Sequence, residues 1–166
     1  MKIDPVGKTL LVAFSVPGKA VPWKAPTVTR WSTYKNPKLI AWQTVIAMCA
    51  DKAWSGEPYC GPVEVHFWFI RKASKKIDLL HWFRKRPDVD NVFKAFADTI
   101  TGQALKGGRA NPANPMGRIL GDDSHIVSVM IRKQYGEADS LYAAIYSVDE
   151  QAPKLPFDLN FRMNDI

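Results

Sequence analysis

The stretch Pro62–Ile70 (PVEVHFWFI) alternates between two kinds of side chain, and this alternation decides the fold. One face is apolar and consists of Val63, Val65, Phe67 and Phe69. The other face is mixed and consists of Glu64, His66 and Trp68. Successive side chains of a β-strand point to opposite faces of the sheet, so the pattern predicts a strand with one buried face. We expect helices from the flanking sequence to cover that face.

Two helices are predicted on either side of this strand in the sequence. Asn36 and Pro37 can begin the first, which runs to about Trp54. Its apolar residues at helical spacing are Leu39, Trp42, Ile46, Cys49, Ala50 and Ala53. The second follows Asp88, a favoured N-cap residue, and its apolar stripe is Val89, Val92, Phe93, Phe96 and Ile100.

Three further strands complete the expected sheet. Lys8–Val16 is apolar and β-rich, and 125–133 and 141–148 are typical of a closing hairpin with its turn at 135–138. The prediction is an α+β fold with a small mixed β-sheet, helices packed on one face, and the order β-α-β-α-β-β. Residues 1–149 form the expected domain and 150–166 a C-terminal tail, while 102–121 is predicted to be a long loop.

The charge balance indicates a polyanionic partner. The 166 residues include 23 Lys and Arg against 16 Asp and Glu, a net charge of +7 that favours binding to phosphate. Cys49 and Cys60 lack metal or redox spacing and are expected to be free thiols. No apolar run has the length of a membrane span and no signal peptide is recognisable, so we expect a cytoplasmic protein without membrane contact.

Basic residues gather in two segments that we expect to contact nucleic acid. The first is an irregular, proline-rich loop at 17–38, and the second is the charged run at 71–86 that leads into the second helix. A charge run is more often a solvated loop, and that alternative stays open. The candidate nucleic-acid-binding residues are Lys19, Lys24, Arg30, Arg71, Lys72, Lys75, Lys76, Arg84, Lys85 and Arg86.

Acidic residues are concentrated at two points of this basic chain. Arg86–Lys94 (RPDVDNVFK) stands at the start of the second helix, and Gly121–Ile126 (GDDSHI) precedes a strand. If the start of that strand lies beside the start of the helix, the carboxylates enclose a site for Mg²⁺, which prefers oxygen ligands. The expected metal ligands are Asp88, Asp90, Asp122 and Asp123, with Lys94 as a donor to phosphate or to the attacking water.

A purely structural interpretation of these residues is also available. Aspartates at a helix start cap the helix and match its dipole. Asp90 and Lys94 stand at the spacing of an ordinary ion pair on one helix face. The second acidic pair and the basic flanks favour the metal site over this interpretation.

At these residues the chain resembles the RusA family of Holliday-junction resolvases. The family's D-x-D-N-x-x-K segment is matched by Asp88–Lys94, and its D-D before a strand by Asp122-Asp123. The early Phe14–Pro22 (FSVPGKAVP) is similar to the family's first strand and the P-G-K-x-x-P loop after it. The 102–121 loop and the 150–166 tail are longer than the family usually has.

The resemblance implies a homodimer that binds branched DNA, a four-way junction, and nicks two opposing strands with Mg²⁺ or Mn²⁺. It implies that the catalytic residues are Asp88, Asp90, Lys94 and Asp123, in an enzyme of DNA recombination and repair. Two alternatives stay open. One is a non-catalytic module that binds junctions or DNA, and the other is a metal-dependent nuclease that acts on other branched or duplex nucleic acid.

Overall fold

The fold is built on a five-stranded mixed sheet. The computed structural model describes residues 3–4, 8–25, 27–28, 30, 33–34, 36–74, 81–101 and 119–150. The sheet has the order β1-β2-β7-β5-β6. These strands are β1 (Ile3–Asp4), β2 (Lys8–Pro17), β7 (Ser140–Ser147), β5 (Val63–Lys72) and β6 (Ile126–Gly136). A separate two-stranded ribbon consists of β3 (Thr27–Val28) and β4 (Thr33–Tyr34).

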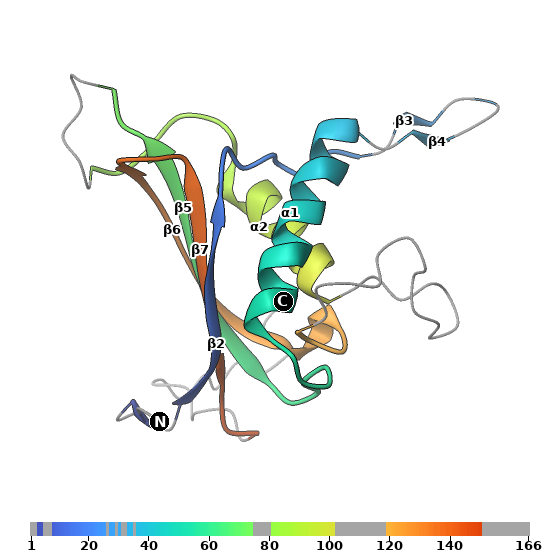
Figure 1. Cartoon of the computed structure of the whole chain (residues 1–166), viewed down its shortest axis with the longest axis vertical. Coiled ribbons are helices and arrows are strands. Elements are labelled where there is room, and N and C mark those ends of the chain that lie inside the picture. The colour runs from blue at the N-terminus through green and yellow to red at the C-terminus, as the bar shows by residue number, and fades with distance from the viewer. Residues whose placement is uncertain are drawn as a thin grey trace, which may run out of the picture.

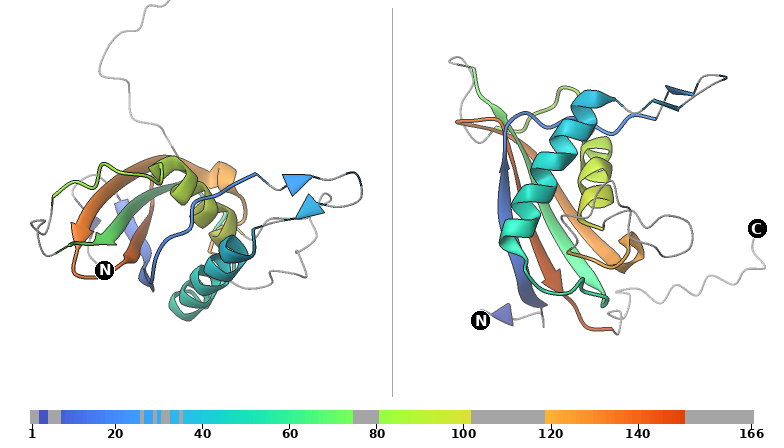
Figure 2. Two further views of the ribbon diagram at one scale, coloured as in Figure 1. Left: turned by 90° about the horizontal axis from the view of Figure 1, so that it is seen from above. Right: turned by 45° about the vertical axis from the view of Figure 1, so that its right-hand side comes forward.

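Two helices cover one face of this sheet, as Figures 1 and 2 show. They are α1 (Pro37–Ala53) and α2 (Val89–Ile100), and a 3₁₀ turn, η1 (Asp123–His125), precedes β6. The principal elements follow the order β2, α1, β5, α2, β6, β7. The predicted α+β class, the mixed sheet, the helices on one face and the order β-α-β-α-β-β are confirmed.

The core lies between the sheet and the helices, where the alternation of 62–70 places it. Val63, Val65, Phe67 and Phe69 are all 0% exposed. The Phe67 ring packs against Phe96 of α2, with centroids 5.2 Å apart, and edge-on against Phe93 at 5.4 Å. Tilted and edge-on contacts are the favoured arrangements of aromatic rings. The strand's apolar face therefore fixes α2 over β5.

Helix α1 begins where the sequence predicts. The Asn36 side chain accepts a hydrogen bond from the Lys38 N–H at 3.0 Å, and Pro37 occupies the first helical turn. One member of the expected apolar stripe is misplaced: Ala53 is exposed in the last turn, and Ala47 is buried instead. The Gln43 amide donates to the Ala95 carbonyl at 3.3 Å, which ties α1 to α2.

The prediction of a closing hairpin between the last two strands is wrong. Strands β6 and β7 are not neighbours, because β5 lies between them, parallel to β6 and antiparallel to β7. Residues 137–139 connect them across the end of β5. Two strand spacings are only ~10 Å, and a few extended residues span that distance. A short turn therefore does not by itself show that two strands pair.

The end of the expected 102–121 loop belongs to the core. Residues 102–118 lie outside the described part of the chain. Ile119 and Leu120 are 0% exposed, and their N–H groups both donate to the Ile100 carbonyl at the end of α2. The Tyr59 N–H donates to the Ile119 carbonyl at 2.8 Å. Their burial corrects the prediction that the loop runs to residue 121.

On the face of the sheet away from the helices, a polar cluster surrounds Glu64. The Lys8 ammonium donates to both carboxylate oxygens of Glu64, at 2.8 and 2.7 Å, and His66 Nε2 lies 2.5 Å from Oε1. Burial raises the pKa of Glu64, but hydrogen bonds from Lys8, His66 and Ser128 outweigh that effect and lower it from 4.5 to about 2. The ionised carboxylate therefore stabilises the fold.

Replacing Glu64 by glutamine is expected to lower the free energy of unfolding at pH 7 by up to ~3 kcal/mol. Because the folded pKa is depressed, this stabilisation is complete above pH 4.5 and is lost as the pH falls from 4.5 to about 2. Urea unfolding across this pH range, monitored by circular dichroism, measures the effect. Equal pH dependence for the variant and the wild-type protein between pH 4.5 and 2 contradicts the assignment.

Two smaller expectations concern the thiols and the membrane. Cys49 and Cys60 are both free thiols, as expected, and Cys60 is exposed. Neither α1 nor α2 is long and apolar enough to cross a membrane, and no other helix in the described part of the chain is either.

Candidate active site

The first acidic pair lies at the start of α2, with both carboxylates in solvent. Asp88 is the N-cap residue, with φ −68° and ψ 137°, but its side chain makes no capping hydrogen bond. Asp88 and Asp90 are both exposed. Capping therefore leaves the Asp88 carboxylate unused, although its position at the helix start is the expected one. A carboxylate held there is available to a ligand.

Lys94 lies one turn further along α2 and does not pair with Asp90. Its ammonium lies 3.7 Å from the Asp98 carboxylate and 5.2 Å from the centre of the Trp23 ring. An exposed ion pair of this kind contributes little to stability. The side chain is half exposed, so the ammonium remains accessible from the same side of α2 as Trp23.

The loop after β2 packs against the first turns of α2. Gly18 adopts φ +94°, a conformation that L side chains rarely reach, and its N–H donates to the Asp139 carbonyl at 2.9 Å. Further along, the Trp23 N–H donates to the Asn91 carbonyl at 2.8 Å. These two contacts hold the intervening lysine-bearing segment beside Asp88.

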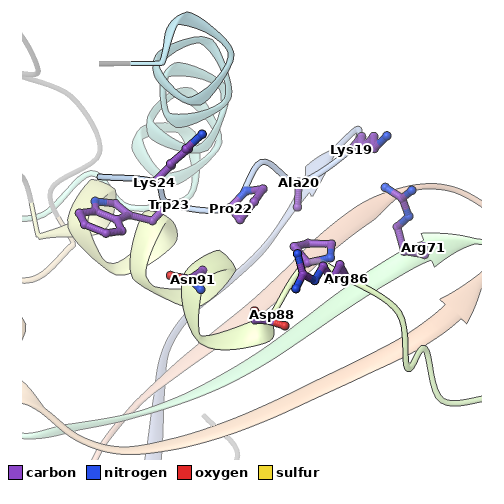
Figure 3. Close-up of a pocket in the computed structure, with 10 residues that line it drawn as sticks. Lys19, Ala20, Pro22, Trp23, Lys24, Arg71, Arg86, Asp88 and Asn91 are labelled. Atoms are coloured by element: carbon purple, nitrogen blue, oxygen red, sulfur yellow. The ribbon is translucent and has the colours of Figure 1, made fainter. Parts of the chain in front are cut away.

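A cavity of ≈450 Å³ lies between this loop and the start of α2 (Figure 3). Four cationic side chains, one carboxylate and one amide contribute to its wall. The full lining is Lys19, Ala20, Pro22, Trp23, Lys24, Arg71, Arg86, Pro87, Asp88 and Asn91. The cavity brings together four of the predicted nucleic-acid-binding residues and one predicted metal ligand. A wall of this composition suits an anion that also carries a divalent cation.

Arg71 is the most constrained of these cations. Its Nε lies 3.6 Å from the Asp139 carboxylate, and its guanidinium carbon lies 5.8 Å from the centre of the Phe83 ring. Its buried Nη1 has no hydrogen-bond partner among the described residues. A buried guanidinium donor without a partner is costly, and a phosphate oxygen is a suitable acceptor for it.

None of the other predicted cationic residues that the structure describes lines this cavity. Arg84 and Lys85 line a second cavity together with His81, Trp82 and Tyr135. Lys72 is exposed at the end of β5, and Arg30 is exposed between β3 and β4. Lys75 and Lys76 lie outside the described residues.

The second acidic pair stands before β6, where Asp122 caps η1. The Asp122 carboxylate accepts a hydrogen bond from the Ser124 N–H at 2.9 Å. Hydrogen bonds from the Ser124 side chain and backbone lower the pKa of Asp122. Asp123 is exposed. Asp122 therefore has a local structural role that Asp123 lacks.

Within one chain the two acidic pairs lie at opposite ends of α2, and Figure 2 shows the turn η1 at the end of that helix and not at its start. Ile119 and Leu120, just before the second pair, bond to the last residue of α2. Lys133 donates to the Pro87 carbonyl, immediately before Asp88, at 2.8 Å. From Ile126 to Lys133 the strand rises ~23 Å. The expected juxtaposition of strand start and helix start is not formed within one chain, because α2 runs antiparallel to β6.

No metal site is complete within the described part of one chain. No group of three or more His, Cys, Asp or Glu residues is placed there to hold an ion. The four predicted ligands are therefore divided into two pairs, Asp88 with Asp90 and Asp122 with Asp123.

Two residues that position this site were not predicted from the sequence. The Asp139 carboxylate accepts a hydrogen bond from the Lys72 N–H at 3.0 Å in addition to its contact with Arg71, and the Asp139 backbone carbonyl accepts one from the Gly18 N–H. The Lys133 ammonium donates to the Lys85 and Pro87 carbonyls, both at 2.8 Å. Lys133 lies in β6 and Asp139 in the turn between β6 and β7, both far from the motif in sequence, and no sequence signal distinguishes them from neighbouring charged residues such as Arg132 and Glu137.

Comparison with known proteins identifies the family of the chain. A search among curated proteins found no match. A family model described as endodeoxyribonuclease RusA matches residues 17–107, more than half of the 166-residue chain. The match contains the loop after β2, the cationic cavity and the Asp88–Lys94 motif, and it ends before Asp122. The chain belongs to the RusA family of endodeoxyribonucleases.

Proposed function

We propose that this endodeoxyribonuclease resolves four-way DNA junctions by paired nicks, as a Mg²⁺- or Mn²⁺-dependent homodimer, in DNA recombination and repair. The observation that supports this most directly is the exposed, uncapped Asp88 carboxylate on the wall of a cavity with four cationic side chains. A protein that only bound DNA would gain nothing from a carboxylate facing phosphate. A divalent cation between them removes that repulsion.

The donor chemistry of the site fits a divalent cation of the Mg²⁺ type. Asp88 and Asp90 offer exposed carboxylate oxygens, the ligands that Mg²⁺ prefers, and water and phosphate oxygens commonly complete its coordination. Bound there, the cation supplies an activated water and withdraws charge from the phosphate. Asp123 is the better candidate of the second pair, because Asp122 is engaged in capping η1.

The cationic residues would orient the strand that is cut. Arg71 offers its unpartnered Nη1 to a phosphate oxygen, and Arg86, Lys19 and Lys24 surround the same cavity. Lys94 can donate to the charge that develops on the phosphate in the transition state. Its contact with the Trp23 ring keeps the ammonium on the side of α2 that faces the loop after β2.

A second copy would bring the two acidic pairs together. In the described part of the chain, the first half of β6 pairs with β5 on one side only, and it exposes Val127 at 60% and Val129 at 39%. A twofold axis beside Ser128 would pair two such edges antiparallel. That register would set Asp123 opposite Lys133 of the partner subunit, the residue bonded beside the start of α2. Each site would then take Asp88 and Asp90 from one chain and Asp123 from the other.

Cleavage of a labelled synthetic four-way junction, compared with a linear duplex of the same sequence, tests this function. We expect paired nicks on opposing strands of the junction in Mg²⁺ or Mn²⁺, none in excess chelator, and far slower cutting of the duplex. Equal cutting of both substrates contradicts junction selectivity. Tight binding without cutting in either metal contradicts catalysis.

A further inference from the structure

The segment that leads into α2 carries an exposed tryptophan at the edge of the sheet. His81–Phe83 lies along the end of β6: Trp82 bridges Gln134, the Tyr135 N–H donates to the His81 carbonyl, and the Phe83 N–H donates to the Lys133 carbonyl. Neighbouring side chains in an extended segment point to opposite sides. Because Phe83 is buried, Trp82 is turned outward and is 63% exposed.

The support beneath Trp82 is rigid. The Phe83 ring packs edge-on against Phe69 of β5, with centroids 5.7 Å apart, and against Tyr135 of β6 at 5.2 Å. The Lys133 ammonium lies 4.9 Å from the centre of the Phe83 ring. The backbone of Trp82 is therefore fixed on both sides, and the exposed indole stands at a defined place on the surface.

The surroundings of Trp82 select for a flat, negatively charged ligand. Among the residues that the structure describes, a cavity of ≈500 Å³ is lined by His81, Trp82, Arg84, Lys85 and Tyr135, none of which carries a carboxylate. Aromatic side chains offer a stacking surface to any base, while cations neutralise the adjoining phosphates. A second copy of this chain would bring like charges to this surface, which disfavours self-association here. The apolar edge at Val127 and Val129 is a different part of β6.

This surface is continuous with the start of α2. Lys133 holds the carbonyls of Lys85 and Pro87, so the segment from Trp82 to Asp88 is fastened to β6. Asp88 follows Trp82 by six residue steps along the chain, a reach of at most ~20 Å. That reach equals about six base steps of a DNA strand. One strand can therefore contact both places.

We propose that Trp82 is a stacking residue for an unpaired base of DNA, with Arg84 and Lys85 binding the phosphates on either side of that base. This subsite deepens the proposed function and rests on it, because a branched substrate supplies unpaired or splayed bases beside the cut. Recognition by stacking accepts every base, so the subsite selects for DNA structure and not for sequence.

Binding of two fluorescein-labelled probes without divalent metal tests the subsite: a single-stranded oligothymidylate and a blunt duplex. Fluorescence anisotropy gives the Kd of each. For Trp82→Leu we expect the Kd for oligothymidylate to rise about tenfold and that for the duplex to stay unchanged. Trp82→Phe keeps a stacking ring and is expected to lose less than threefold. Tyr142→Leu, which removes another exposed ring, is the matched control and is expected to change neither Kd.

Each other pattern overturns the proposal. Equal loss on both probes indicates a general effect on DNA affinity, and equal loss in the Phe and Leu variants indicates a structural role for Trp82. Unchanged binding by Trp82→Leu shows that no base stacks there. These readouts need no cleavage, so they separate the two proposals. If the wild-type protein cuts junctions and the Trp82→Leu variant binds both probes with the wild-type Kd, only the proposed stacking subsite is refuted.

Discussion

Replacing Asp90 by asparagine is expected to lower metal-dependent junction cleavage by about a hundredfold or more while junction binding survives. The amide keeps the size of the side chain but removes the charge that holds the cation. Asp90 is exposed in the first turn of α2, where no packing depends on it, so the variant should fold normally. Cleavage rate in Mg²⁺, and junction affinity without metal, are the two measurements.

The control for this variant is Asp51→Asn, which removes the same charge from an exposed position on α1. It should cut junctions at the wild-type rate. Removing either carboxylate leaves the chain slightly more basic, so junction affinity without metal should hold or rise in both variants. Wild-type cleavage by Asp90→Asn would remove this residue from the metal site.

A heterodimer of Asp90→Asn and Asp123→Asn chains is expected to recover cleavage that neither variant has alone. If each site takes Asp88 and Asp90 from one chain and Asp123 from the other, one site of the mixed dimer is wholly intact. The other site carries both substitutions. Co-expression with two different affinity tags, followed by purification through both, isolates this heterodimer. It should nick one strand of each junction and leave the opposing strand uncut.

The matched control is the heterodimer of Asp88→Asn and Asp90→Asn chains. Both substitutions lie at the same end of α2, so every site of this dimer lacks one ligand whichever way the sites are assembled. It should stay inactive. If the first heterodimer is equally inactive although each chain binds junction DNA, the sites are not shared between chains.

Those parts of the fold that depend on local pattern could be predicted from the sequence. The alternation of Pro62–Ile70 reports which side chains are buried, and the Asn36-Pro37 pair marks a helix start by satisfying the free N–H groups there. The pairing of strands is a non-local property. The expected turn at 135–138 suggested neighbouring strands, but β7 forms its pairs with β2 and β5, a preference that the turn residues do not encode.

The candidate site likewise has local features that could be predicted from the sequence and non-local features that could not. The acidic motif and the two basic segments contained the charged residues that line the Asp88 cavity, because charge is visible residue by residue, but the uncharged half of its lining was not predicted. The placement of Asp123 was not predictable, because it depends on the direction of α2 relative to β6. Lys133 and Asp139 were missed for a related reason. Their contacts join segments that are far apart in sequence, and neither residue belongs to a recognisable motif.

The separation of the two acidic pairs along α2 has a consequence for the cell that makes this nuclease. If the proposed site takes Asp88 and Asp90 from one chain and Asp123 from another, a chain on its own carries an incomplete ligand set, and cutting would require an encounter between two chains. At low copy number the count of assembled sites falls with the square of the chain concentration. Such an enzyme is self-limiting: traces of it leave the chromosome unharmed, and activity begins only when enough has been synthesised.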